Sequence, residues 1–267
     1  MSRPSAAPLA GRRIAVLRGA GQAALLAREL EVLGAEVLLV PLWRTAPPAD
    51  PGALHDAAAR VAAYDWVVFT SANGVHAFFD ALSRTGVEEA AWRRVRFAAV
   101  GPGTARALEE RGARPDLTAR EHRAESLVEA MAARGMAGQR VLFPRAHDAR
   151  DVLVKGLRAA KAAVDDVVAY RLLPEPTRKE QLLELGAGDT DALLLTSPST
   201  VRFLKSACQA HGLPWPIETP CFCIGPVTAE EARQHGLHVA AVAPRYTISG
   251  LLDALVSFFS APGPAEV

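Results

Sequence analysis

Asp65-Trp-Val-Val-Phe-Thr-Ser71 and Asp191-Ala-Leu-Leu-Leu-Thr-Ser197 are the two stretches that decide the fold. Each begins with an aspartate, continues with four apolar residues and ends in Thr-Ser. A short apolar run between polar residues is typical of a buried strand, and Ser or Thr is a preferred residue at the start of a helix. Each stretch therefore predicts a buried strand that leads directly into a helix.

Further matches follow in the same order along the two halves of the chain. Arg13-Ile-Ala-Val-Leu-Arg18 matches Arg140-Val-Leu-Phe-Pro-Arg145 at a shift of 127, and Gly101-Pro-Gly-Thr-Ala105 matches Gly225-Pro-Val-Thr-Ala229 at a shift of 124. Self-similarity in a constant order is the sequence mark of a repeated structural unit. We therefore predict an internal duplication that covers almost the whole chain.

Short apolar runs alternate with amphipathic stretches from end to end. This alternation favours parallel sheets with helices on both faces, so we expect an α/β fold with two parallel-sheet lobes. The predicted strands are residues 14–17, 37–40, 66–70, 97–100, 141–143, 164–169, 192–196, 221–224 and 239–242.

Both copies carry a proline-rich stretch at the same place, Thr45–Pro51 and Leu173–Thr177. Proline favours extended backbone and ends helices, so we expect the chain to cross between the lobes at these two points. The expected division is a discontinuous first lobe (11–42 with 173–260), a second lobe with both linkers (43–172), and flexible ends (1–10 and 261–267).

The composition limits the classes of function. The 267 residues carry a net charge of +1, which argues against a protein that coats nucleic acid. No apolar run approaches the roughly 18 residues of a membrane span, and the first ten residues lack the apolar core of a signal peptide. Three cysteines without a framework spacing fit a reducing cytoplasm. We expect a cytoplasmic monomer that binds neither nucleic acid nor membrane.

The repeated loops are the candidate binding site, because ligands of parallel sheets bind beyond the carboxyl ends of the strands. Free amides at a helix N-terminus hold anions, although each loop taken alone is better explained as a plain helix cap. The candidate substrate-binding residues of the loops are Ser71, Ala72, Asn73, Gly101, Gly103, Thr104, Ser197, Ser199, Thr200, Gly225 and Thr228. With the ends of both copies facing one cleft, the loops would suit a polyanion.

Two arginines and one tyrosine complete the candidate site. Arg18 and Arg145 end equivalent strands, where each can hold a carboxylate through two hydrogen bonds or form a surface ion pair. Tyr170 ends another strand, where it can donate a proton or a hydrogen bond, or simply pack in the core.

A competing motif, Gly19-Ala-Gly-Gln-Ala-Ala24, fits the dinucleotide fingerprint. The acidic residue that such sites need is missing at the end of the next strand, Leu39–Leu42, and the matching loop of the other copy, Ala146–Arg150, has no glycine. The seven histidines show no metal-binding spacing. These observations disfavour a nicotinamide cofactor and a metal.

Several runs together resemble the uroporphyrinogen-III synthases. They are Asp65–Val75, Ala99–Ala105, Val167–Arg171, Leu195–Ser199 and Ile224–Ala229, within a resemblance that extends from about Arg13 to Phe259. The first strand departs from the family, because its usual Arg-Pro ending is Arg18-Gly19 here.

The resemblance implies two flavodoxin-like lobes joined by a two-stranded ladder. It implies an enzyme of tetrapyrrole synthesis that closes linear hydroxymethylbilane to uroporphyrinogen III, with loss of water and inversion of the last pyrrole ring through a spiro intermediate, and without cofactor or metal. By the same resemblance Tyr170 assists departure of the hydroxyl, and Thr228 and Ser197 match the family's threonine and serine.

A non-enzymatic, two-lobed binding module for an anionic small molecule remains the alternative. The same helix N-termini would bind the anion in such a module. Replacing Tyr170 by phenylalanine would leave the affinity of a pure binding protein for its ligand unchanged, and such a protein has no catalytic rate that the replacement could reduce.

Overall fold

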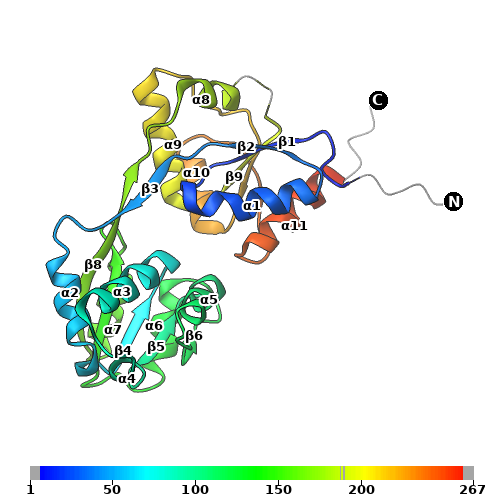
Figure 1. The fold of residues 1–267 in the computed structure, drawn as a ribbon. Coiled ribbons are helices and arrows are strands. Elements are labelled where there is room, and N and C mark those ends of the chain that lie inside the picture. The colour runs from blue at the N-terminus through cyan, green and yellow to red at the C-terminus, as the bar shows by residue number, and fades with distance from the viewer. Residues whose placement is uncertain (1–6, 187, 189, 261–267) are drawn as a thin grey trace. The chain divides into compact units, whose positions relative to one another are not determined.

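The computed structural model describes residues 7–186, 188 and 190–260 (Figure 1). The chain divides into two compact units: unit 1 is Met1–Arg44 with Leu173–Val267, and unit 2 is Thr45–Leu172. The chain therefore passes from one unit to the other twice, once within strand β3 (Trp43–Ala46) and once within strand β8 (Ala163–Pro174).

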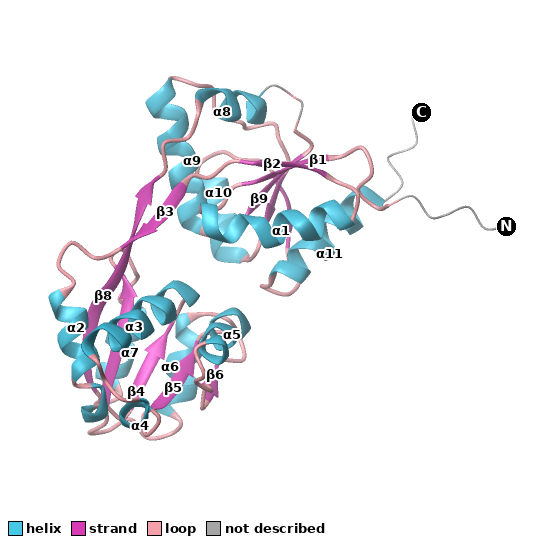
Figure 2. Cartoon of the chain, viewed as in Figure 1, coloured by secondary structure: helices cyan, strands magenta, loops and turns pink. Residues whose placement is uncertain are grey.

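Unit 1 is a five-stranded parallel sheet in the order β11-β10-β9-β1-β2, with helices along it (Figures 1 and 2). Its strands are β1 (Arg13–Val16), β2 (Glu36–Leu39), β9 (Ala192–Leu195), β10 (Cys221–Cys223) and β11 (Val239–Val242). Its helices are α1 (Ala20–Val32), α8 (Lys179–Gly186), α9 (Pro198–His211), α10 (Pro226–Gln234) and α11 (Ile248–Ser260).

Unit 2 contains the parallel strands of a second sheet, in the order β8-β7-β4-β5-β6, with β3 beside β8. Its other strands are β4 (Trp66–Phe69), β5 (Arg96–Ala99), β6 (Leu117–Thr118) and β7 (Arg140–Ala146). Its helices are α2 (Gly52–Ala59), α3 (Ala72–Thr85), α4 (Glu89–Trp92), α5 (Pro102–Glu110), α6 (Ala124–Ala132) and α7 (Val152–Ala159), with a short 3₁₀ turn η1 (Val61–Ala63).

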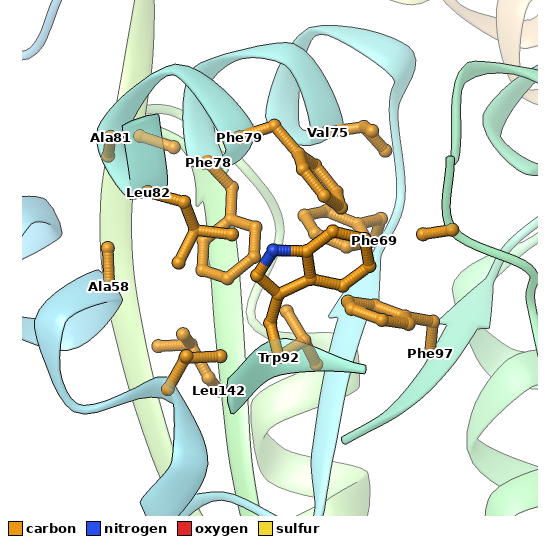
Figure 3. Packing of buried hydrophobic residues seen from close by; sticks show 14 of the residues in the cluster. Ala58, Phe69, Val75, Phe78, Phe79, Ala81, Leu82, Trp92, Phe97 and Leu142 are labelled. Carbon is orange, nitrogen blue, oxygen red and sulfur yellow. The ribbon is translucent and has the colours of Figure 1, made fainter. Parts of the chain in front are cut away.

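Strand β4 shows why the apolar runs form central strands. Successive side chains of a strand point to opposite faces, and all four residues of β4 are buried. Val67 and Phe69 enter the core beneath α2, α3, α4 and α5. Trp66 and Val68 enter the core on the opposite face, beneath α6 and α7. In Figure 3 the first of these cores contains Trp92, whose ring meets that of Phe79 edge to face at 5.2 Å.

The aspartates that open the two deciding stretches anchor the sheets. Asp65 Oδ2 accepts the backbone amide of Arg140 at 2.8 Å, and Asp191 Oδ2 accepts the backbone amide of Arg13 at 2.8 Å. Each carboxylate thus ties the start of one strand to the start of its neighbour. Hydrogen bonds of this kind to a charged group contribute about 1.5–3 kcal/mol each.

The structure corrects the expected chain ends and adds two strands. Leu9 is fully buried in the core of unit 1 and its amide donates to the carbonyl of Leu33, so the expected flexible end does not reach that residue. Residues 1–6 and 261–267 of the expected ends lie outside the described residues. Strands β3 and β6 were not predicted, because β6 has two residues and β3 directly precedes a proline.

Candidate functional site

A hydrogen-bonded cluster occupies the carboxyl end of β4 in unit 2. Ser71 is the N-cap of α3, with extended backbone, and its Oγ accepts the Gly74 amide at 3.0 Å. The same Oγ lies 2.9 Å from the hydroxyl of Tyr170, which β8 brings to this edge of the sheet. Asn73 also hydrogen-bonds the Tyr170 hydroxyl. The cap thus does more than start a helix, because it also positions the phenol.

Tyr170 is 6% exposed, and burial raises the pKa of its phenol because the phenolate would lose its hydration. The hydrogen bonds from Ser71 and Asn73 work in the opposite direction, and the charge of Asp148 adds to the rise. Tyr170 is consequently neutral at physiological pH, so its hydroxyl keeps the proton that it can donate.

The N-terminus of α5 carries the second predicted loop of unit 2. Gly101 is an extended N-cap without a side-chain hydrogen bond, and Pro102 follows it, so the first amides of the helix have no capping side chain. No heavy atom stands within 4 Å of the place where a side chain at Gly103 would begin. A side chain at Gly101 would begin 3.1 Å from the His122 ring. Gly103 is therefore open to a ligand, and His122 lies over Gly101.

Unit 1 repeats both loops. Ser197 is the N-cap of α9, and its Oγ accepts the Thr200 amide at 3.3 Å and lies 2.9 Å from Ser199 Oγ. Gly225 is the extended N-cap of α10, and Tyr246 lies over it at 3.5 Å from the position of an added Cβ. The two units thus present the same pair of helix N-termini, each pair at the carboxyl edge of its own sheet.

Comparison with known proteins identifies the family. Residues 24–253 match the family model described as Uroporphyrinogen-III synthase HemD. The uroporphyrinogen-III synthase of Synechococcus elongatus is 32% identical over 256 residues, which are 93% of this chain and 96% of that protein. The chain belongs to the uroporphyrinogen-III synthase family. A putative uroporphyrinogen-III synthase of Methanothermobacter thermautotrophicus is also 32% identical, and the match covers 91% of each chain.

Solved structures of uroporphyrinogen III synthases have the same fold. A mutant of the Thermus thermophilus protein superposes with a TM-score of 0.63 at 23% identity, and the match covers 92% of this chain and 97% of that one. The Helicobacter pylori protein superposes with a TM-score of 0.59 at 16% identity over 92% and 99% of the two chains. The expected mixed α/β fold with parallel sheets is therefore confirmed.

Within this family member, the structure places the predicted arginines at different kinds of position. Arg145 is 16% exposed, and its guanidinium pairs with Asp166 at 3.1 Å and donates to the Ala149 carbonyl at 2.9 Å. Any substrate carboxylate would compete with Asp166 for it. Arg18 follows β1 and is partly buried, and burial lowers the pKa of its guanidinium from the ordinary value.

The remaining predicted residues fall into an open and a buried group. Ala72, Asn73, Ser197 and Ser199 are partly exposed at the helix starts. Thr104, Thr200 and Thr228 are buried beneath their loops, where the side chains can support the loop but are shielded from solvent. As substrate contacts, all of these residues stay predictions.

Two side chains near the loops were not predicted from the sequence, His122 and Tyr246. They are 124 positions apart, the same shift that relates Gly101 to Gly225, so the repeat contained the signal for both.

The dinucleotide-like motif has a structural explanation: a side chain at Gly19 would begin 3.0 Å from Trp43 Nε1. The glycine is needed for that close approach of Trp43.

The described residues hold no group of three or more His, Cys, Asp or Glu side chains that could bind a metal ion. None of the helices in the described part of the chain combines the length and the apolar character of a membrane span.

Proposed function

We propose that this chain is a uroporphyrinogen-III synthase, a lyase that closes hydroxymethylbilane with inversion of the terminal pyrrole ring and loss of water, in tetrapyrrole synthesis. The observation that carries the proposal is the neutral, buried Tyr170 hydroxyl, held by Ser71 and Asn73 at the N-terminus of α3. Membership of the family supplies the reaction.

The substrate carries acetate and propionate carboxylates on every ring, so it is a polyanion. Helix N-termini bind anions because their first amides point outward and the helix dipole is positive there. Each contributes roughly 0.3–1 kcal/mol at an exposed site. The uncapped starts of α5 and α10 supply such ends in both units, and the open position at Gly103 lets a carboxylate reach the backbone.

The first chemical step breaks the bond between the hydroxymethyl carbon and its oxygen. The departing hydroxyl needs a proton to leave as water, and the Tyr170 hydroxyl supplies that proton or a hydrogen bond to it. The terminal ring then bonds to the freed methylene carbon through the ring carbon that already carries its bridge, which gives the spiro intermediate. The old bridge bond breaks and re-forms at the free α-carbon of the same ring. That carbon loses its proton, so the phenol is restored and the balance is substrate to product plus water. Positioning carries much of the remaining catalysis, because the substrate must be folded so that the inverted product forms.

The proposal includes two flavodoxin-like lobes that arose by duplication. Written in the order β2-β1-β9-β10-β11, the sheet of unit 1 has the flavodoxin-like arrangement 2-1-3-4-5, and β8-β7-β4-β5-β6 has the same arrangement if β7 is counted first. The register supports this pairing of copies: Ile14 lies opposite Ala192 as Val141 lies opposite Trp66. The two strands β3 and β8 would then be the ladder that joins the lobes.

The reaction as proposed needs no cofactor and no metal, since water loss and carbon–carbon bond formation involve no change of oxidation state. The proposed partner is hydroxymethylbilane alone, with no role for nucleic acid or membrane, and the proposed form is a cytoplasmic monomer.

The test is an isomer assay. Purified protein is mixed with freshly prepared hydroxymethylbilane, and the products are oxidised and separated into the inverted and uninverted isomers. The proposal expects the inverted isomer, formed faster than spontaneous closure. Only the uninverted isomer, at the spontaneous rate, would refute it and favour the binding module.

A further inference from the structure

Unit 2 contains a cavity of about 350 Å³ beside Tyr170. It runs along α3, from Asn73 and Tyr170 past His76 and Ala77 to Arg84, and His55 of α2 also lines it. The eleven positions from Asn73 to Arg84 span roughly 16 Å at about 1.5 Å per helical residue. The catalytic candidate thus lies at one end of an elongated cavity and a cation at the other.

The equivalent place in unit 1 is filled. At the shifts of the repeat, Tyr170 corresponds to Trp43 and Ala77 corresponds to Phe203. Trp43 and Phe203 stack with their ring centroids 5.6 Å apart and their planes at 18°. The two copies share the helices and strands around this place, but unit 2 has Ala77 where unit 1 has the large aromatic Phe203. The cavity is therefore a specific departure from the repeat.

A third exchange changes the polarity of the same place. The position of His55 on α2 corresponds to Leu182 on α8, which is buried in unit 1. Unit 2 thus has a polar histidine where unit 1 has an apolar side chain. Removal of bulk together with introduction of polar groups is the pattern of a ligand site, which needs apolar walls and a few placed polar groups.

His76 is a fixed hydrogen-bond donor in this cavity. Arg111 Nη1 donates to Asp80 Oδ1 at 2.8 Å, and Arg111 Nε donates to His76 Nδ1 at 3.3 Å. A guanidinium has no acceptor, so His76 Nδ1 must accept and the ring proton must be on Nε2. Nε2 is therefore the ring nitrogen of His76 that remains to donate a hydrogen bond.

The remaining lining residues are mostly apolar, and the one carboxylate among them, Asp80, is paired with Arg111 at 2.8 Å. Pro48, Leu54 and Ala77 supply apolar walls, and Arg84 supplies an exposed positive charge. No ion pair of Arg84 is found among the side chains that the structure describes. The volume lies at the low end of the roughly 300–1,000 Å³ of small-molecule sites, which suits one substituted ring and not a whole tetrapyrrole.

We propose that this cavity is the subsite for one pyrrole ring of the substrate, the ring that bears the hydroxymethyl group, with its acetate and propionate directed to His76 and Arg84. The inference rests on the proposed function, since Tyr170 identifies the ring. Apolar contact with the walls holds the ring, and its hydroxymethyl oxygen reaches the Tyr170 hydroxyl. The ring is then fixed while the rest of the chain folds toward the carbon that becomes reactive.

The test fills the cavity with the side chain that unit 1 already has at this place. Ala77→Phe copies Phe203, and His55→Leu copies Leu182 as a second variant with a smaller change of volume. The control is Ala59→Phe, which adds the same bulk to an exposed position of α2 outside the cavity lining. All three variants are checked for an unchanged fold by circular dichroism and thermal unfolding.

Two readouts are used. Catalytic efficiency with hydroxymethylbilane should fall on the order of 100-fold in Ala77→Phe, because even a 1 Å misplacement can have that effect, and should not change in Ala59→Phe. Calorimetry with a monopyrrole that carries one acetate and one propionate should show saturable binding to the wild type and to Ala59→Phe, and at least a tenfold weaker binding to Ala77→Phe and His55→Leu.

The outcomes separate this inference from the proposed function. A wild type that makes no inverted isomer refutes the synthase, whatever the monopyrrole does. An active wild type with a fully active Ala77→Phe, or monopyrrole binding that is absent or unaffected by both cavity variants, refutes the subsite. Should Ala77→Phe fold poorly, His55→Leu decides by the same two readouts.

Discussion

The replacement Tyr170→Phe tests the proposed role of the phenol as proton or hydrogen-bond donor. The contacts of the Tyr170 hydroxyl determine how much this replacement should lower the free energy of unfolding. It removes one hydroxyl, 2.9 Å from Ser71 Oγ, and leaves the ring in the core. Ser71 Oγ still accepts the Gly74 amide, so the cap of α3 survives. Loss of the neutral hydrogen bonds of the Tyr170 hydroxyl with Ser71 and Asn73 costs about 1 kcal/mol of unfolding free energy each, equivalent to about 2–4 °C per bond in a chain of this size.

The expected effect on the rate is much larger than the effect on stability. Positioned proton donors contribute typically about 10²–10⁴-fold to the rate of a reaction. We expect the turnover number for the inverted isomer to fall by about 100-fold or more. The affinity for hydroxymethylbilane should change little, because the proposed contacts with its carboxylates lie elsewhere.

Tyr64→Phe is the matched control in the same unit. Tyr64 is also buried, and its hydroxyl donates to Asp165 Oδ2 at 2.7 Å. Because the acceptor is charged, deletion of this hydroxyl should destabilise the protein by about 1.5–3 kcal/mol, about as much as Tyr170→Phe. Its rate should equal that of the wild type, since Tyr64 precedes β4 and lies at the opposite end of that strand from Ser71.

The assay compares both variants with the wild type under saturating hydroxymethylbilane, with isomers separated after oxidation and stability measured by urea unfolding. If Tyr170→Phe makes the inverted isomer at the wild-type rate, the assignment of the phenol is wrong. If the two variants lose rate in proportion to their loss of stability, Tyr170 acts only as a core residue.

Three further predictions follow from other contacts. Gly103→Val copies Val227 of unit 1, which is 53% exposed, and should stabilise α5 by a few tenths of a kcal/mol. It should also reduce kcat/KM, because the new side chain would keep a substrate carboxylate away from the open backbone at this position; an unchanged kcat/KM would show that no carboxylate approaches it. Asp191→Ala should lower the unfolding free energy by about 1.5–3 kcal/mol in urea titrations, because the Arg13 amide loses its charged acceptor. A loss below about 0.5 kcal/mol, which is typical of an ordinary surface substitution, would contradict the anchoring role. Burial and the hydrogen bond to Asp165 raise the pKa of Tyr64 to about 12, so this tyrosine ionises at lower pH in the unfolded chain than in the folded one. The stability advantage of the wild type over Tyr64→Phe should therefore shrink as the pH rises from about 10 toward 12. If the urea midpoints of the two proteins differ by the same amount at pH 9 and at pH 11, this prediction is wrong.

The sequence predicts the elements of this fold well because its central strands are continuous apolar runs with capped helices after them. Ser71 and Ser197 cap helices at the two places where the Thr-Ser ends predict them. Strands β3 and β6 could not be found in this way, because they depend on a partner strand more than on their own residues: β6 consists only of Leu117 and Thr118 beside β5.

The candidate site was predictable only as far as the loops. Neither copy alone marks His122 or His76 as part of a site, since a histidine without a spacing partner has no periodic signal. The ion pair of Arg145 with Asp166 was also out of reach, because it depends on the register that places Asp166 opposite Phe143 on the next strand. Which groups a side chain faces across a sheet is a property of the pairing.

The duplication offers a way to separate structural from functional residues within one molecule. Where the copies agree, as Asp65 agrees with Asp191 and Ser71 with Ser197, the same hydrogen bond recurs and stabilises the same element, so a function in either copy needs separate evidence. At other positions the two copies carry different residues although the surrounding helices and strands are the same. Stability alone does not explain such a difference, because the residue of one unit shows that a different side chain is compatible with the same fold.

Three disagreements lie at one cavity of unit 2: Tyr170 against Trp43, Ala77 against Phe203 and His55 against Leu182. Substitutions that carry a unit 1 residue into this cavity should therefore reduce activity while leaving the unfolding free energy unchanged or higher, since buried apolar area increases. The reverse substitution, Phe203→Ala in unit 1, should instead cost about 1–2 kcal/mol of stability, because this partly buried ring loses its stacking contact with Trp43. Its activity per folded molecule should remain that of the wild type. A Phe203→Ala protein that is as stable as the wild type would mean that the stacked pair does not fill this place, and the comparison of the two copies would lose its force.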